Sequence, residues 1–131
     1  MTAFTINLKD DPAIVETYRR YHHEVWPEVQ ASLRSVGVQR MEIFLLGRRL
    51  VMIVEMRDGL DYRTAFTSHA ASSPRVGQWE QLMKSLQEPP PEAGPGEWWA
   101  SMEPVFQLGN SAADKSQEPA VAPVTNRART S

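Results

Sequence analysis

The sequence predicts a single α+β domain with the element order βαββαβ, which is the order of a ferredoxin-like sandwich. Apolar and polar residues alternate in a short segment near the start, which is the period of a half-buried strand. Two helical patterns follow, then two strand-like runs, two more helical patterns and a last apolar run. The length of 131 residues suits one such domain.

The first strand and the first pair of helices are predicted within the first 37 residues. Residues 4–8 alternate apolar and polar side chains and form the strand. A helix begins at Pro12, because acidic residues followed by proline are typical of a helix start. Pro27 interrupts this helix at Trp26, since proline removes a backbone donor and crowds the preceding turn. A second helix starts at Pro27, and Gly37 ends it.

A hairpin and a second pair of helices follow. Residues 38–46 and 50–56 are strongly apolar, so we predict two central strands. Residues 61–69 have the pattern of a short helix, and a longer helix begins at Pro74 and ends before a proline-rich stretch. The helices cover one face of the sheet. We expect the other face both to pack against a second copy and to form a pocket, because its apolar residues would otherwise lie in water.

The C-terminal part contains a last strand and a tail. Val105, Phe106 and Leu108 predict the strand. Residues 110–131 contain no aromatic side chain and little large apolar surface, too little to offset the entropy lost on ordering. We therefore predict a folded domain at residues 1–109 and a disordered tail at residues 110–131, or a strap that orders only against a partner.

Composition excludes several classes of function. The chain has no cysteine, which rules out disulfides, thiolate metal sites and a cysteine nucleophile. Its net charge of -2, with acidic and basic residues interleaved, gives no footprint for nucleic acid. The start lacks the pattern of a secretory signal, and every apolar run is far shorter than the roughly 20 residues of a membrane span. We expect a cytoplasmic protein that binds neither nucleic acid nor membrane.

One helical face combines a tyrosine with a histidine. Tyr18 and His22 are four residues apart and therefore share a face of the first helix. Histidine titrates near neutral pH, so it can act as an acid or a base. The alternative is that both residues belong to the packed stripe of the helix. A metal site on His22, His23 and Glu24 is not expected, because adjacent helix residues point about 100° apart.

Tryptophans provide a second candidate feature. Trp79 lies on an amphipathic helix, where its face suits the apolar side of a sugar ring, although core packing is the commoner use. Trp98 and Trp99 follow a flexible loop and either pack a dimer or cover the pocket. His69 lies in another element and is a weak further candidate for a metal ligand. No phosphate-binding loop or nucleophile elbow is present.

Short motifs spread over residues 3–108 resemble the L-rhamnose mutarotase family. The segments that carry the likeness are Tyr18-x-x-x-His22, Val25-Trp26-Pro27-Glu28, Leu33 with Gly37, Leu50-Val51 to Glu55, Gln78-Trp79 to Met83, and Glu103-Pro104-Val105-Phe106-Gln107-Leu108. The resemblance implies a homodimeric, ferredoxin-like α+β barrel. It also implies an isomerase that interconverts the α and β anomers of a six-carbon deoxy sugar without a cofactor or metal.

The resemblance also implies roles for individual residues. His22 matches the catalytic histidine of the family, Tyr18 its substrate-binding tyrosine, and Trp79 the first of two paired tryptophans. Met41 stands where the family commonly has tyrosine, and Glu80 where it has the second tryptophan. Both positions contact sugar in the family, so these departures bear on which monosaccharide is bound, with L-rhamnose, L-fucose or another 6-deoxyhexose as candidates.

The chemistry expected from this resemblance is acid/base ring opening and closure. We expect His22 to donate a proton to the ring oxygen, Tyr18 to orient the sugar and relay a second proton, and Trp79 to stack on the ring. Two other functions fit the same element order, because a fold does not fix a function. One is a dimeric α+β-barrel oxygenase or heme-handling protein, and the other is a sugar-binding or interaction domain without turnover.

Overall fold

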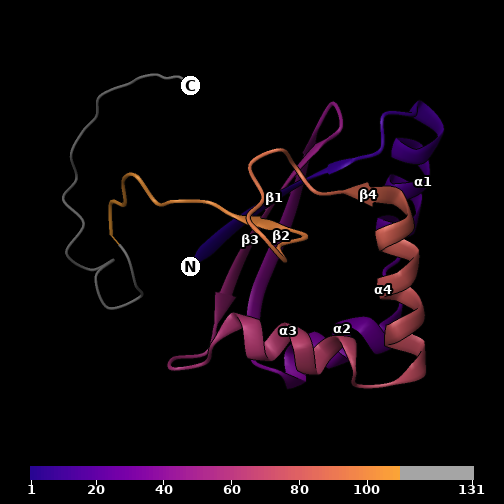
Figure 1. Cartoon of the computed structure of the whole chain (residues 1–131). Coiled ribbons are helices and arrows are strands. Elements are labelled where there is room, and N and C mark those ends of the chain that lie inside the picture. The colour runs from indigo at the N-terminus through magenta and orange to yellow at the C-terminus, as the bar shows by residue number, and fades with distance from the viewer. Residues whose placement is uncertain (110–131) are drawn as a thin grey trace.

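The computed structural model describes residues 1–109, and the tail predicted at residues 110–131 lies outside them. A sheet forms one layer and four helices form the other, with the helices along one side and one end of the sheet (Figure 1). The elements are β1 (Thr2–Leu8), α1 (Pro12–His23), α2 (Pro27–Ser35), β2 (Val38–Leu46), β3 (Arg49–Met56), α3 (Tyr62–Ala70), α4 (Pro74–Leu86), β4 (Gln87–Glu88) and β5 (Ala100–Ser101). The α+β class and the ferredoxin-like order are confirmed.

The predicted helix starts are confirmed, and side chains cap three of the four helices at residues 1–109. Oδ1 of Asp11 accepts a hydrogen bond from the backbone N–H of Ala13 at 2.9 Å. Asp61 and Ser73 cap α3 and α4 in the same way. Each cap satisfies a backbone donor that the first helical turn leaves without a partner. No helix within residues 1–109 is long and apolar enough to cross a membrane.

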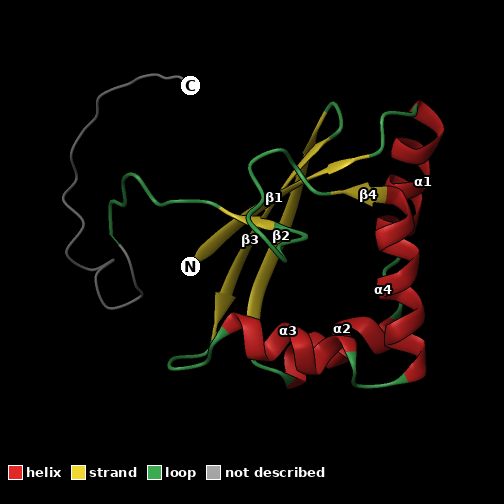
Figure 2. Ribbon diagram, in the orientation of Figure 1, coloured by secondary structure: helices red, strands yellow, loops and turns green. Residues whose placement is uncertain are grey.

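The sheet is antiparallel, with strand order β2-β3-β1-β4, and β5 also pairs with β1. Figure 2 shows the strands running beside one another next to the helical layer. In the central strand β1, Ile6 and Leu8 are fully buried among side chains of the helices. Ile6 lies opposite Leu50 of β3, and Leu50 lies opposite Leu45 of β2. This face of the sheet therefore supplies the core under the helices.

The prediction of a last strand at Val105, Phe106 and Leu108 is wrong. The final strand is instead split into β4 and β5, which pair with successive parts of the same edge of β1 and are separated by residues 89–99. Ser101 already lies opposite Phe4, and β1 begins at Thr2. The chain has therefore reached the end of β1 before residue 105. The three apolar side chains are 90%, 81% and 60% exposed.

The prediction that the pocket lies on the face away from the helices is also wrong. The cavity lies on the helix-covered face, because β2 and β3 line it through the same side chains that face the helices. The opposite face carries Phe44 and Leu46 of β2, which are 54% and 84% exposed. The helices stand off from part of the sheet and leave a space between the two layers.

Candidate active site

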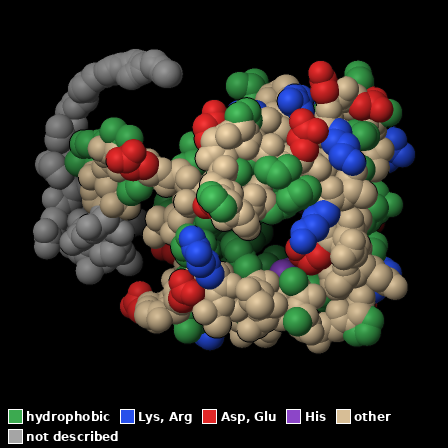
Figure 3. All heavy atoms as spheres, in the orientation of Figure 1, with side chains coloured by type: hydrophobic (Ala, Val, Ile, Leu, Met, Phe, Trp, Pro, Cys, Tyr) green, Lys and Arg blue, Asp and Glu red, His purple; other side chains and the backbone are tan. Residues whose placement is uncertain are grey.

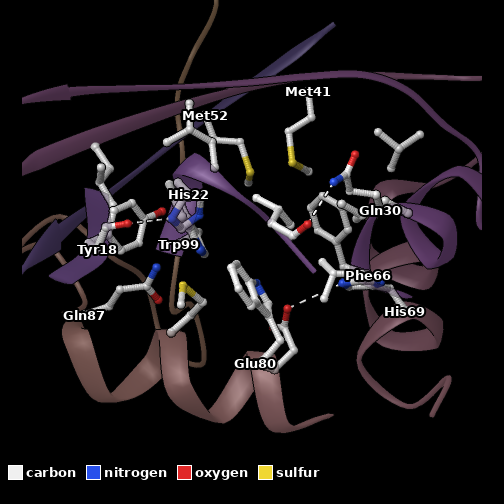
Figure 4. A pocket seen from close by; sticks show the side chains of 18 of the residues that line it. Tyr18, His22, Gln30, Met41, Met52, Phe66, His69, Glu80, Gln87 and Trp99 are labelled. Atoms are coloured by element: carbon white, nitrogen blue, oxygen red, sulfur yellow. Dashed lines mark hydrogen bonds and ion pairs between the residues drawn. The ribbon is translucent and has the colours of Figure 1, made fainter. Parts of the chain in front are cut away.

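A cavity of about 1000 Å³ lies between the sheet and the helices. The space-filling view shows its opening, with apolar side chains inside and charged side chains around it (Figure 3). Helices α1, α2, α3 and α4, strands β2 and β3, and the Trp98-Trp99 pair all contribute to its wall. Figure 4 shows side chains from these elements converging on the same space.

Tyr18 and His22 form one end of the cavity. Their rings stack at a centroid distance of 4.1 Å with an angle of 25° between the planes. Nδ1 of His22 lies 2.9 Å from the carbonyl oxygen of Tyr18, one helical turn earlier. A carbonyl only accepts hydrogen bonds, so this contact places the proton on Nδ1. In neutral His22, Nε2 then carries a free lone pair.

Burial sets the protonation state of both residues. It lowers the pKa of His22, an effect that the hydrogen bond to the Tyr18 carbonyl opposes. His22 is therefore neutral at neutral pH, with Nε2 as a proton acceptor. Burial raises the pKa of the Tyr18 hydroxyl well above its usual value; the side chain of Gln87 opposes this shift and the charge of Glu80 adds to it. Tyr18 therefore stays protonated and serves as a hydrogen-bond donor.

Trp79 forms the wall beside His22. Its ring lies edge-to-face against His22 at a centroid distance of 5.4 Å, and against Trp26 at 5.1 Å. The side chain is 4% exposed and belongs to the main apolar cluster. Trp79 is therefore a core residue that also lines the cavity, and its stacking on a sugar ring stays a prediction.

The other two predicted site residues line the same cavity. Met41 on β2 lies opposite Val54 of β3, on the face toward the helices. Glu80 on α4 follows Trp79 and is partly buried. The structure therefore brings all five predicted site residues to one cavity, although they come from three elements.

Sequence reasoning missed a hydrogen-bonded group at the other end of the cavity. Nδ1 of His69 lies 2.8 Å from Oγ of Ser32, and that oxygen lies 2.9 Å from Oγ of Ser72. Nε2 of His69 lies 3.5 Å from Oε2 of Glu80. From the sequence, His69 is a candidate only as a metal ligand. The sole signal for Ser32 was its place one turn after Val29 on the buried face of α2.

The tryptophan pair closes the remaining side. Trp98 donates from Nε1 to Oε1 of Gln87 at 2.9 Å, and both Trp98 and Trp99 line the cavity. The sequence left two uses open for this pair, packing a dimer or covering the pocket. The position of the pair at the cavity wall fits a cover for the pocket. Within residues 1–109, no group of three or more histidine, aspartate and glutamate side chains is placed to hold a metal ion.

Comparison with known proteins identifies the family. Residues 1–108 match the family model of L-rhamnose mutarotase. An L-fucose mutarotase from Xanthomonas campestris pv. campestris is 38% identical over 110 residues, covering 82% of this chain and 87% of that protein. An L-rhamnose mutarotase from Burkholderia orbicola is 28% identical over 108 residues, covering 82% and 99%.

A solved structure shows the same fold. The crystal structure of an L-rhamnose mutarotase from Formosa agariphila superposes with a TM-score of 0.58 at 20% identity, covering 82% of this chain and 96% of that one. With the family model spanning residues 1–108, the chain belongs to the L-rhamnose mutarotase family.

Proposed function

We propose that the protein is an isomerase that interconverts the α and β anomers of a 6-deoxyhexose. Its relatives include proteins named L-rhamnose mutarotase and L-fucose mutarotase. The observation that carries the proposal is His22, whose Nδ1 is held by the Tyr18 carbonyl while its other nitrogen is left to act in the cavity. Mutarotation needs only proton transfers, so the proposed reaction requires no cofactor or metal.

The proposed reaction begins with removal of a proton from the sugar. Nε2 of His22 takes the proton of the anomeric hydroxyl, the C1–O5 bond breaks, and the ring oxygen takes a proton from an acid. The open-chain aldehyde rotates about C1–C2, and the reverse transfers close the ring on the other face. The low pKa and Nδ1–H of His22 favour this role over the predicted donation to the ring oxygen.

The neighbouring aromatic side chains position the sugar in this proposal. Tyr18 remains protonated because of its burial, so it donates a hydrogen bond to a sugar oxygen rather than relaying a proton. Trp79 gives the apolar face of the sugar a rigid surface, since its own ring is fixed by aromatic neighbours on α1 and by Trp26. A displaced sugar would lose alignment with His22, which costs rate steeply.

We place L-fucose first among the candidate sugars. The L-fucose mutarotase relative is 38% identical, against 28% for the L-rhamnose mutarotase relative. Met41 and Glu80 replace the aromatic residues expected at two sugar-contacting positions and change the shape and charge of the cavity wall. A carboxyl group accepts hydrogen bonds from sugar hydroxyls, which an indole ring cannot do.

We further propose a cytoplasmic homodimer. Phe44 and Leu46 leave apolar surface on the face of the sheet away from the helices, and the exposed side chains at Val105 and Phe106 add to the apolar surface of the chain. A second copy that packs on this face removes that surface from water. Sedimentation equilibrium tests the proposal, and a monomer at micromolar concentration would contradict it.

The activity is tested by exchange NMR of anomer interconversion. L-Fucose, L-rhamnose and D-glucose are compared with and without protein. We expect faster exchange for a 6-deoxy sugar, and a loss of about 10²- to 10⁴-fold in His22→Ala, the range for one acid/base group. Arg20→Ala is the control, because Arg20 is an exposed residue of the same helix that does not line the cavity. An unchanged rate in folded His22→Ala would overturn the assignment.

A further inference from the structure

Hydrogen-bond directions around His69 fix which of its nitrogens carries a proton. The Ser72 hydroxyl donates its single proton to the carbonyl oxygen of His69 at 2.8 Å. Ser32 must then donate to Ser72 across their 2.9 Å contact, because that contact has no other proton. With its proton used, Ser32 accepts from His69, so Nδ1 of His69 carries hydrogen. This series of hydrogen bonds begins at the ring of His69 and ends at the carbonyl of the same residue.

This arrangement leaves Nε2 of His69 facing Glu80. Nε2 lies 3.5 Å from Oε2 of the Glu80 carboxylate, as the dashed line near His69 marks in Figure 4. The contact joins a carboxylate oxygen to the ring nitrogen that the Nδ1–H tautomer leaves without hydrogen, so there is a place for one further proton between the two groups. Glu80 has no other cationic partner within 4.0 Å in residues 1–109. Lys84, one turn later, instead places its ammonium 5.9 Å from the centroid of Trp98.

The pair stands in the same cavity as His22. His69 and Glu80 both line it. The reaction proposed above requires an acid for the ring oxygen while His22 acts as the base. Tyr18 holds its proton too tightly for this step because it is buried. His69 and Glu80 supply two groups that can exchange a proton, and both line the cavity.

We propose that Glu80 is the second acid/base residue of the site and that His69, fixed by Ser32 and Ser72, positions it. This inference rests on the proposed mutarotase function. On ring opening, His22 takes the anomeric proton, the electrons of the C1–O5 bond pass to O5, and O5 takes a proton from the Glu80 carboxyl group. On closure, O5–H returns its proton to Glu80 and the aldehyde oxygen regains one from His22. No other reactant is consumed.

The first test compares the same substitution at two glutamates. Glu80→Gln keeps the size of the side chain and removes the acid, so we expect kcat to fall about 10²-fold with KM little changed. Glu28→Gln is the control, because Glu28 also belongs to an ion pair, with Arg75 at 3.8 Å, but lies outside the cavity. In Glu80→Ala, added formate restores part of kcat, which a purely structural role of Glu80 does not allow.

The second test needs no sugar. Nitrogen-15 NMR of the free protein reports which ring nitrogens of His69 carry hydrogen, and we expect hydrogen on Nδ1. An unprotonated Nδ1 would overturn the positioning role. If the wild type accelerates exchange and Glu80→Gln is as fast, the inference fails while the proposed function stands. If the wild type accelerates no sugar, both fail.

Discussion

The two histidines at opposite ends of the cavity are held in different ways. His22 on α1 bonds through Nδ1 to the carbonyl of Tyr18, four positions earlier in the same helix. His69 on α3 bonds through Nδ1 to Ser32 on α2, 37 positions away, and is 4% exposed. One ring is oriented by local helix geometry, and the other by the packing of two helices. Both rings therefore carry hydrogen on Nδ1, one because of a hydrogen bond within its own helix and the other because of a hydrogen bond between two helices.

The difference predicts how each end responds to change. Substitutions of Tyr18 and His22 should alter the rate with little loss of stability, because the hydrogen bond that orients the His22 ring lies within one helix. Substitutions at the His69 end should reduce stability first, since they leave buried polar groups without partners. Trp79 and Glu80 are neighbours on α4 and connect the two ends, so this helix should matter to both.

Trp79→Ala should have the largest effect on stability. Removing a buried tryptophan costs about 3–5 kcal/mol through lost burial and the space left behind. It also removes the contact with the His22 ring, so both stability and rate should fall. Urea unfolding of Trp79→Ala and Trp79→Phe measures the effect, with the smaller loss expected in Trp79→Phe. A loss below about 1 kcal/mol in the alanine variant would show that the tryptophan is not part of the core.

Ser32→Ala should disrupt the hydrogen bonds at the His69 end of the cavity and leave the His22 end unchanged. It removes the acceptor of the Nδ1–H of His69 and should cost about 1–3 kcal/mol of stability. Ser85→Ala is the matched control, because Ser85 is exposed on α4 and bonds only within its own helix. Thermal unfolding of the two variants gives the comparison. Equal stabilities would mean that the Ser32 contact contributes nothing.

Tyr18→Phe should weaken the His22 end without unfolding it. The ring that stacks on His22 remains, while the hydroxyl that donates to the sugar is lost. A neutral hydrogen bond contributes about 0.5–1.5 kcal/mol, so we expect kcat/KM to fall by up to roughly tenfold. Exchange NMR at several sugar concentrations separates kcat from KM. A fall as large as in His22→Ala would instead assign Tyr18 a direct part in proton transfer.

The smallest effect expected is a dependence of stability on pH. Burial lowers the pKa of His22 in the folded state, so between the two pKa values the unfolded chain binds more protons. The contribution of His22 to stability is therefore full above the unfolded pKa of about 6.5 and is lost as the pH falls through the folded value. His22→Gln should show a weaker decrease of Tm between pH 7.5 and 5 than the wild type. Parallel curves would contradict this coupling.

Most of the fold was predictable because its signals are local. Asp11 before Pro12 and Ser73 before Pro74 marked helix starts that the caps confirm. The last strand was mispredicted because Val105 and Phe106 have a strand-like pattern, whereas a strand also needs an edge to pair with. The edge of β1 is already used by β4 and β5.

The candidate site was likewise predictable only where its signals are local. The sequence by itself determined the βαββαβ order and the pairing of Tyr18 with His22, because strand period, helix period and caps act over a few residues. Only the tertiary structure decided that the cavity lies under the helices and that Ser32, His69 and Glu80 meet at its far end. Contacts between α2, α3 and α4 depend on how the helices pack, and no spacing along the chain records that packing.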